Sequence, residues 1–149
     1  MVPLYQRNFQ VNYFEKDEIT WIIESHLTDT EHDIMVTLDV SVPEMVIEDA
    51  QIKFIRHPLK ECTVIEQKAA QLKGVNILKD YRSKVLPLFM GPEGCPNIMT
   101  LLGVSTPGIP YFYYPHQMSI GQMEPEEWWS MVRTQFAGDC LAHKLFNQK

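Results

Sequence analysis

Histidine, aspartate and cysteine side chains that suit metal binding or nucleophilic chemistry fall where elements of this chain are expected to begin. His32 and Asp33 open an expected strand, and Cys62 and Cys95 each stand at the start of an expected helix. Functional groups occur more often at such element ends than inside the elements. A thiol at a helix start also meets the positive end of the helix dipole, which favours the thiolate. The sequence therefore predicts a site built from His32, Asp33, Cys62 and Cys95.

Metal binding is the leading chemistry for these residue types. Two thiolates and one imidazole suit zinc or an iron centre, including an iron–sulfur cluster, and a carboxylate from Asp33 or Glu31 completes four-coordination. His57, in a loop before a proline, is an alternative nitrogen ligand. The spacings of about thirty residues match no short metal motif. The leading expectation is a small metal-binding accessory protein whose protein client is unknown.

A cysteine-nucleophile enzyme is the second interpretation. Cys95 at a helix start would be the nucleophile, with His32 as its base and Asp33 as the group that orients the base. The residue that separates the two interpretations is Cys62, because a metal site needs both thiols whereas such an enzyme needs only Cys95. No nucleophile motif accompanies Cys95, so a non-enzymatic protein is favoured.

A third interpretation concerns the aromatic C-terminal region. Tyr111–Tyr114, Trp128 and Trp129, together with the many methionines, would line an apolar pocket or a homodimer interface. The competing interpretation is that these side chains pack inside the core, as aromatic residues at helical spacing usually do. For the two tryptophans we favour packing in the core. For the tyrosine run both interpretations stay open.

Composition and charge exclude some classes of partner. Of the 149 residues, 45% are hydrophobic and 21% are charged, as in an ordinary globular protein. The net charge is −6 with scattered Lys and Arg, which argues against binding nucleic acid. The sequence contains no apolar run of the ~20 residues that span a bilayer and no signal-peptide pattern at its start. The three cysteines form no paired motif, and Cys140 is expected in the core. We expect a cytoplasmic protein.

The first half of the chain predicts strands, because Phe9–Tyr13 and His32–Val42 have a period of two and Ile19–Leu27 is rich in β-branched and aromatic residues. The expected strands run from Phe9 to Tyr13, from Ile19 to Leu27, from His32 to Val42 and from Met45 to Ile55. Short connections between them favour an antiparallel four-stranded meander. Asp29 is expected to be a charge of the second turn, and His26 has no obvious partner.

The second half switches to helical periods. Helices are expected from Lys60 to Lys73, from an Asn76 cap to Leu86, and from Pro96 to Gly103. The prolines between Val104 and Gly121 argue against a regular helix there, and Pro125 begins a final helix that continues to Leu145. Strands followed by helices indicate an α+β fold with helices on one face of an antiparallel sheet. We expect one domain, with a core over residues 1–103 and an arm over 104–149 packed on it.

Several stretches resemble a family of uncharacterised bacterial proteins known only as a domain of unknown function. They are Leu27-Thr28-Asp29-Thr30, His32-Asp33-Ile34-Met35, Cys62, Leu72-x-Gly74, and Gly94-Cys95 leading to Leu101-Leu102. Members usually read Gly-Cys-Thr-His-Leu at the last motif, where this chain reads Gly94-Cys95-Pro96-Asn97-Ile98. The resemblance covers most of the chain up to about Gly103.

The chain is also distantly similar to the NifU/IscU-type iron–sulfur scaffold proteins. Asp33 falls at their strand-opening aspartate, Ile47-Glu48-Asp49-Ala50 repeats one of their strands, and Cys62 and Cys95 fall at their second and third cysteines. Glu31 or His32 stands where they have the first cysteine. This likeness implies an IscU-like fold with an added C-terminal arm and helix, and handling of iron or sulfur. It also implies that Asp33 is an oxygen ligand or a group that labilises the bound cluster.

Overall fold

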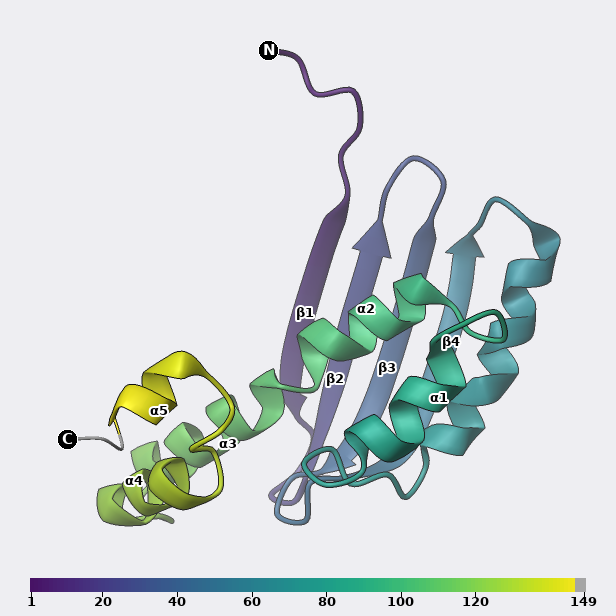
Figure 1. The fold of residues 1–149 in the computed structure, drawn as a ribbon. Coiled ribbons are helices and arrows are strands. Elements are labelled where there is room, and N and C mark those ends of the chain that lie inside the picture. Colours follow the sequence, from purple (N-terminus) through teal and green to yellow (C-terminus); the bar gives the residue numbers. More distant parts are fainter. Residues whose placement is uncertain (147–149) are drawn as a thin grey trace. The chain divides into compact units, whose positions relative to one another are not determined.

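A computed structural model describes residues 1–146 of the chain. The chain divides into two compact units, Met1–Ile109 and Pro110–Lys149. The first unit contains a sheet and the helices that cover it, and the second is helical (Figure 1). The expected packing of residues 104–149 on the core stays a prediction.

The first unit is built on a four-stranded antiparallel sheet in the order β1-β2-β3-β4 (Figure 1). Its strands are β1 (Asn8–Glu15), β2 (Thr20–Thr28), β3 (Asp33–Ser41) and β4 (Val46–Arg56). Each lies within a few residues of the strand that the sequence predicts, because β-branched and aromatic residues are frequent there, with a clear period of two in β1 and β3. The α+β class and the meander are therefore confirmed.

The sheet buries one of its two faces. In β2 the odd-numbered side chains from Trp21 to Leu27 are buried, and they lie opposite the buried even-numbered side chains of β3 from Ile34 to Val40. Helices cover this face in Figure 1, and they contribute fully buried Phe89, Leu101 and other apolar side chains to the core. Burial of one such side chain stabilises the fold by about 1.5–3 kcal/mol. The burial pattern follows from the pleat of the strands, which directs alternate residues of β2 and β3 to opposite sides of the sheet.

The helices of the first unit follow the strands, as the sequence predicts, but their geometry differs. The elements are η1 (Lys60–Leu72), η2 (Tyr81–Val85), α1 (Leu86–Phe89) and α2 (Pro96–Ser105). Of these, η1 is a 3₁₀ helix and η2 a π-helical turn. Asn76 does cap a turn, since its Oδ1 accepts from the backbone N–H groups of Leu78 and Lys79 at 3.0 Å. The regular helix expected after it is replaced by this turn and by η2 and α1.

The second unit corrects the expectation for residues 104–121. A helix, α3 (Gly108–Ser119), runs through this segment although it contains Pro110 and Pro115. Pro110 lies in the first turn, where a backbone N–H has no partner within the helix, and only Pro115 removes an interior hydrogen bond. Aromatic contacts of this helix offset part of that loss, since Tyr114 stacks on Trp128 with ring centroids 5.6 Å apart.

The remaining helices are α4 (Pro125–Thr134) and α5 (Leu141–Phe146). The final helix was expected to run unbroken from Pro125 to Leu145, but the structure interrupts it after Thr134. Trp128, Val132 and Phe136 form a small core in this unit, packed against tyrosines and methionines. Trp128 is 7% exposed and Trp129 44% exposed, so the core interpretation holds for the first tryptophan alone.

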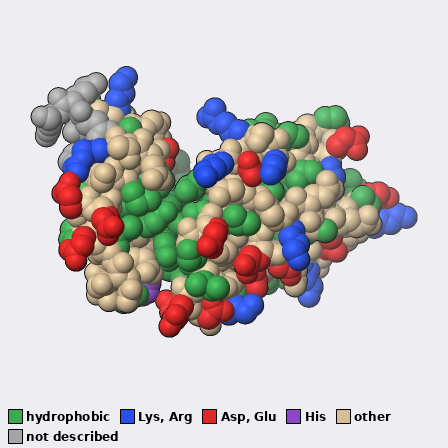
Figure 2. Space-filling model, turned by 90° about the horizontal axis from the view of Figure 1, so that it is seen from below, with side chains coloured by type: hydrophobic (Ala, Val, Ile, Leu, Met, Phe, Trp, Pro, Cys, Tyr) green, Lys and Arg blue, Asp and Glu red, His purple; other side chains and the backbone are tan. Residues whose placement is uncertain are grey.

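Figure 2 shows Lys and Arg side chains dispersed among Asp and Glu on the face in view. The two signs of charge are thus mixed over that face. In the part of the chain that the structure describes, no helix has the length and apolar character needed to cross a membrane.

Candidate functional site

A single carboxylate holds the turn between β2 and β3. Oδ1 of Asp29 accepts hydrogen bonds from the backbone N–H groups of Glu31 at 2.8 Å and His32 at 2.7 Å. The backbone N–H of Asp29 donates to the His32 carbonyl oxygen at 2.9 Å. Aspartate closes turns in this way because its short side chain reaches the N–H groups two and three residues on. The turn therefore fixes the position of His32 immediately before β3.

The same carboxylate orients the His32 ring. Nδ1 of the imidazole lies 3.0 Å from Oδ1 of Asp29. Oδ2 of Asp29 accepts from Arg7, at 2.7 Å from Nε and 2.6 Å from Nη2. Partial desolvation raises the pKa of Asp29, but the hydrogen bonds from backbone and side-chain donors outweigh it and lower the pKa from 3.8 to about 2. Asp29 is therefore ionised at neutral pH.

The ionised Asp29 decides which nitrogen of His32 carries the hydrogen. A carboxylate only accepts hydrogen bonds, so Nδ1 of the imidazole must donate to it. In the neutral ring, Nε2 is then an acceptor with a free lone pair. This lone pair can accept a hydrogen bond, take a proton, or bind a metal ion. A carboxylate behind the ring is also the partner that metal-binding histidines usually have.

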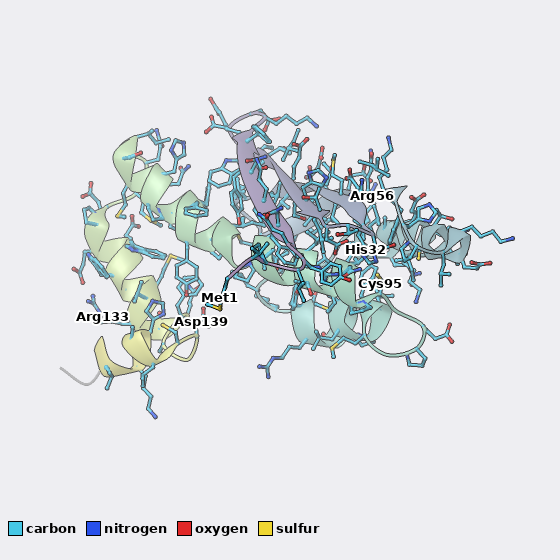
Figure 3. The ribbon with its side chains drawn as sticks, turned by 90° about the horizontal axis from the view of Figure 1, so that it is seen from above. Met1, His32, Arg56, Cys95, Arg133 and Asp139 are labelled. Atoms are coloured by element: carbon cyan, nitrogen blue, oxygen red, sulfur yellow. The ribbon has the colours of Figure 1, made fainter. Side chains whose placement is uncertain are left out.

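Two arginines and one asparagine tie the turn to the surrounding elements. Arg7, just before β1, donates from Nη1 to Oδ1 of Asn97 in the first turn of α2 at 3.2 Å. Arg56, the last residue of β4, donates from Nη2 to the carbonyl oxygens of Asp29 at 2.5 Å and His32 at 3.2 Å. Figure 3 labels His32 and Arg56 at this end of the sheet. Residues from the segment before β1, from β4 and from α2 thus converge on one turn.

A cavity of about 290 Å³ lies beside this turn. It is lined by one continuous stretch before β1 and one around the turn, namely Tyr5, Gln6, Arg7, Asp29, Thr30, Glu31 and His32. The volume lies near the lower end of the range for small-molecule sites. Most of the exposed wall is apolar, with the polar groups of these residues set into it, and the His32 side chain within it is 18% exposed. The place therefore suits a small molecule that has both an apolar part and a polar group.

Asp33 lies on the opposite face of the sheet from the helices. Its Oδ1 is 2.7 Å from Nε2 of His26. Both residues belong to the row of β2 and β3 side chains that alternates with the buried row. In the structure Asp29, rather than Asp33, is therefore the carboxylate that orients His32. His26, which had no obvious partner in the sequence, has one.

Cys95 begins α2 as expected, and its position depends on Gly94 (Figure 3). The Cys95 backbone N–H donates to the Phe89 carbonyl oxygen at 3.0 Å. A Cβ atom at Gly94 would lie 2.1 Å from that same oxygen, which no side chain can tolerate. Lys68 of η1 holds the loop before Gly94, because its Nζ donates to the carbonyl oxygens of Leu88 at 3.0 Å and Glu93 at 2.5 Å. The glycine of the Gly-Cys motif is thus a steric requirement of this loop.

Cys62 stands in the first turn of η1, where its backbone N–H donates to the Leu59 carbonyl oxygen at 3.0 Å. Cys62 and Cys95 are partly buried and Cys140 is exposed, so Cys140 is not the core residue that was expected. Within residues 1–146, no group of three or more His, Cys, Asp or Glu side chains could hold a metal ion. Metal binding by His32, Asp33, Cys62 and Cys95 therefore stays a prediction.

Sequence reasoning missed Arg7, Arg56 and Asn97 as members of the site and gave Asp29 only its turn role. The spacing Asp29-x-x-His32 in a tight turn was a usable signal, because such a turn returns the ring to the carboxylate. The hairpin register also predicts that His26 and Asp33 share a face and are diagonal neighbours. The two arginines carry no local signal, because their partners are 22 to 90 residues away in the chain.

Comparison with known proteins assigns the first unit to a family. The family described as "Protein of unknown function (DUF2889)" matches residues 5–108, which include the cavity lining, the turn and α2. No curated protein and no solved structure matches the chain. The likeness to the NifU/IscU-type scaffold proteins receives no support from these comparisons. The expected membership of an uncharacterised family is confirmed: the chain belongs to the DUF2889 family of proteins of unknown function.

Proposed function

We propose that this protein is a binding protein for a small polar molecule, which occupies the cavity beside the β2–β3 turn. His32 is the residue that recognises the molecule, by accepting a hydrogen bond at Nε2. The observation that carries the proposal is the pairing of His32 Nδ1 with the ionised Asp29 at 3.0 Å, at the wall of a cavity of about 290 Å³. An oriented polar group in a small concave site is typical of ligand recognition.

A purely structural role explains only part of this arrangement. The turn is already closed by the two backbone N–H groups that donate to Asp29. Arg7 already neutralises the carboxylate. The imidazole adds little to either task, and its orientation leaves one nitrogen free for a ligand. A binding role accounts for the histidine as well as for the turn.

The test is a thermal-shift screen of the full chain against small polar amines, carboxylates, alcohols and amides. A ligand of this cavity raises the melting temperature of the wild type, because it binds the native state only. The same compound should give a much smaller shift with His32→Gln and an unchanged shift with His57→Gln, a histidine outside the cavity lining. Compounds that stabilise wild type and His32→Gln equally would contradict the proposal.

Metal handling is the second candidate, and one observation favours it. The first unit has two carboxylate–histidine pairs, Asp29–His32 in the β2–β3 turn and Asp33–His26 on the sheet, and each leaves one ring nitrogen for a metal ion. Cys95, two residues before Asn97 of the same network, is a candidate sulfur ligand. Water or a client protein would supply the remaining ligands of a zinc or iron ion held here.

Metal analysis of protein purified without an affinity tag or chelator separates the two candidates. Metal handling predicts near-stoichiometric zinc or iron that falls in both His32→Ala and Cys95→Ala. Small-molecule binding predicts a metal-free protein whose melting temperature zinc does not change. If metal is bound but persists in both variants, the metal lies elsewhere and this candidate fails.

A further inference from the structure

We propose that the ligand of this cavity carries a protonated amine, which Glu31 binds. This inference rests on the proposed function, since it names the chemical class of the molecule that the cavity takes. The charges of the cavity wall, and the partners that each charged group already has, support it.

Negative charge predominates in the lining of the cavity. The lining contains the carboxylates of Asp29 and Glu31 and one guanidinium, that of Arg7. Arg7 and Asp29 pair with each other at 2.6 Å and so offset each other's charge. The charge left over in the wall is that of Glu31.

Glu31 and Asp29 differ in the state of their carboxylates. Asp29 already accepts hydrogen bonds from two backbone N–H groups, from Arg7 and from His32. Within residues 1–146, the Glu31 side chain forms no ion pair or hydrogen bond, and only its backbone N–H is engaged. Glu31 is therefore the carboxylate that is available to a ligand.

The other groups of the wall also favour a donor-rich cation. His32 offers the acceptor Nε2, and the Thr30 hydroxyl and the Gln6 amide can accept as well as donate. Tyr5 supplies an aromatic ring, whose face attracts cations. An ammonium group has three hydrogen atoms to donate and no lone pair, so it can use the acceptors of Glu31, His32 and Thr30 together.

An anionic ligand would depend on Arg7, the one cation of the wall. Its guanidinium donates to Asp29 from Nε and Nη2 and to Asn97 from Nη1, and the second N–H of each Nη stays available. An anion would share Arg7 with Asp29 and would meet the carboxylate of Glu31 beside it. The wall therefore discriminates against carboxylates and phosphates.

The test compares three probes of similar shape but different charge, benzylamine, benzyl alcohol and benzoate, by titration of the ¹⁵N-labelled full chain at pH 7. Aliphatic amines are protonated at this pH, as the lysine side chain is. We expect benzylamine to shift the amide signals of residues 5–7 and 29–32 and to bind more tightly than the other two. Glu31→Gln should weaken benzylamine about fivefold, since an exposed ion pair contributes up to ~1 kcal/mol. Glu18→Gln, at the exposed turn before β2, should leave the affinity unchanged.

The outcomes distinguish a failure of the amine proposal from a failure of small-molecule binding. If benzoate or benzyl alcohol binds at these residues as tightly as benzylamine, the amine proposal is overturned while small-molecule binding stands. If both glutamine variants behave alike, Glu31 is not the recognition group and the amine proposal fails. If none of the three probes shifts these signals, and the thermal-shift screen finds no compound dependent on His32, small-molecule binding itself is overturned.

Discussion

Asp29 has two roles, of which the sequence indicates only one. An aspartate between two strands is an ordinary turn residue, and here it does close the turn. It also pairs with Arg7 and fixes the His32 ring, so its ionised state organises the site. A change of one atom in this side chain should therefore affect both the stability of the fold and the chemistry of the histidine.

Asp29→Asn should lower the free energy of unfolding at pH 7 by about 1–2 kcal/mol, because hydrogen bonds to a charged group contribute more than neutral ones. The pKa of Asp29 is about 2 in the folded protein and near 3.8 ordinarily, so its stabilisation is present above pH 3.8 and is lost as the pH falls towards 2. Urea unfolding between pH 2 and 7 should show the two proteins converging in acid. The exposed Asp49→Asn is the control. A difference between wild type and Asp29→Asn that is constant with pH would contradict this account.

Gly94 is the second residue where a small change has a large predicted effect. In Gly94→Ala the new Cβ would lie 2.1 Å from the Phe89 carbonyl oxygen, so the loop that positions Cys95 must shift. We expect a loss of about 2 kcal/mol or more, the cost of overpacking a rigid site. Gly138→Ala is the matched control, since nothing lies within 4 Å of its Cβ position. Chemical denaturation of the two variants compares them directly, and equal stabilities would show that the loop does not have this geometry.

Among the elements, the strands are the part that the sequence predicts well. The β-branched and aromatic residues of β2 are enough to place that strand, and the alternation in β3 places both the strand and its buried face, because the pleat ties side-chain direction to position. The helices are harder to predict, since 3₁₀, π and α geometries share nearly the same apolar spacing. The segment that became α3 was misjudged because its two prolines were weighed without the aromatic packing that compensates them.

The helix α3 leads to a prediction about its prolines. Pro115 lies inside the helix, where alanine is about 3 kcal/mol more favourable, while proline also restricts the unfolded chain by up to ~1 kcal/mol. Pro115→Ala should therefore stabilise the second unit by about 2 kcal/mol. Pro110→Ala, in the first turn, should change stability little. Thermal unfolding followed by tryptophan fluorescence in a Trp21→Phe background, which leaves Trp128 and Trp129, reports on this unit. Destabilisation by Pro115→Ala would indicate that α3 is not a continuous helix.

The site shows why its members were only partly predictable. His32, Asp33 and Cys95 were selected because they lie at element ends, and the structure does place them there. Which partner each one takes depends on side-chain direction and on long-range contacts such as Arg7 with Asn97. Such contacts are separated widely along the chain and leave no periodic pattern.

At the scale of the whole molecule, the family match and the first compact unit nearly coincide. The match ends at residue 108 and the unit at Ile109, and all residues of the cavity wall lie within both. The core of this unit is made of its own sheet and helices. The family domain thus corresponds to one compact body that carries the candidate site.

A chain truncated after Ile109 should therefore fold. Its amide NMR spectrum should be well dispersed, and the signals of the central strands β2 and β3 should overlay those of the full chain. Benzylamine should also shift the cavity signals of the truncated chain as in the full chain, because the whole lining is retained. A collapsed spectrum would show that residues 110–149 are needed for the fold of the first unit.

The central claim is that ionised Asp29 holds His32 with Nε2 unprotonated at the cavity wall. The direct measurement is a long-range ¹H–¹⁵N correlation of the imidazole nitrogens at a pH where His32 is neutral, on wild type and Asp29→Asn. The account predicts that His32 is in the Nδ1–H form in the wild type and that this preference weakens in the variant. An Nε2–H form of His32 in the wild type would contradict the account, because the nitrogen proposed to receive the ligand would already carry a hydrogen.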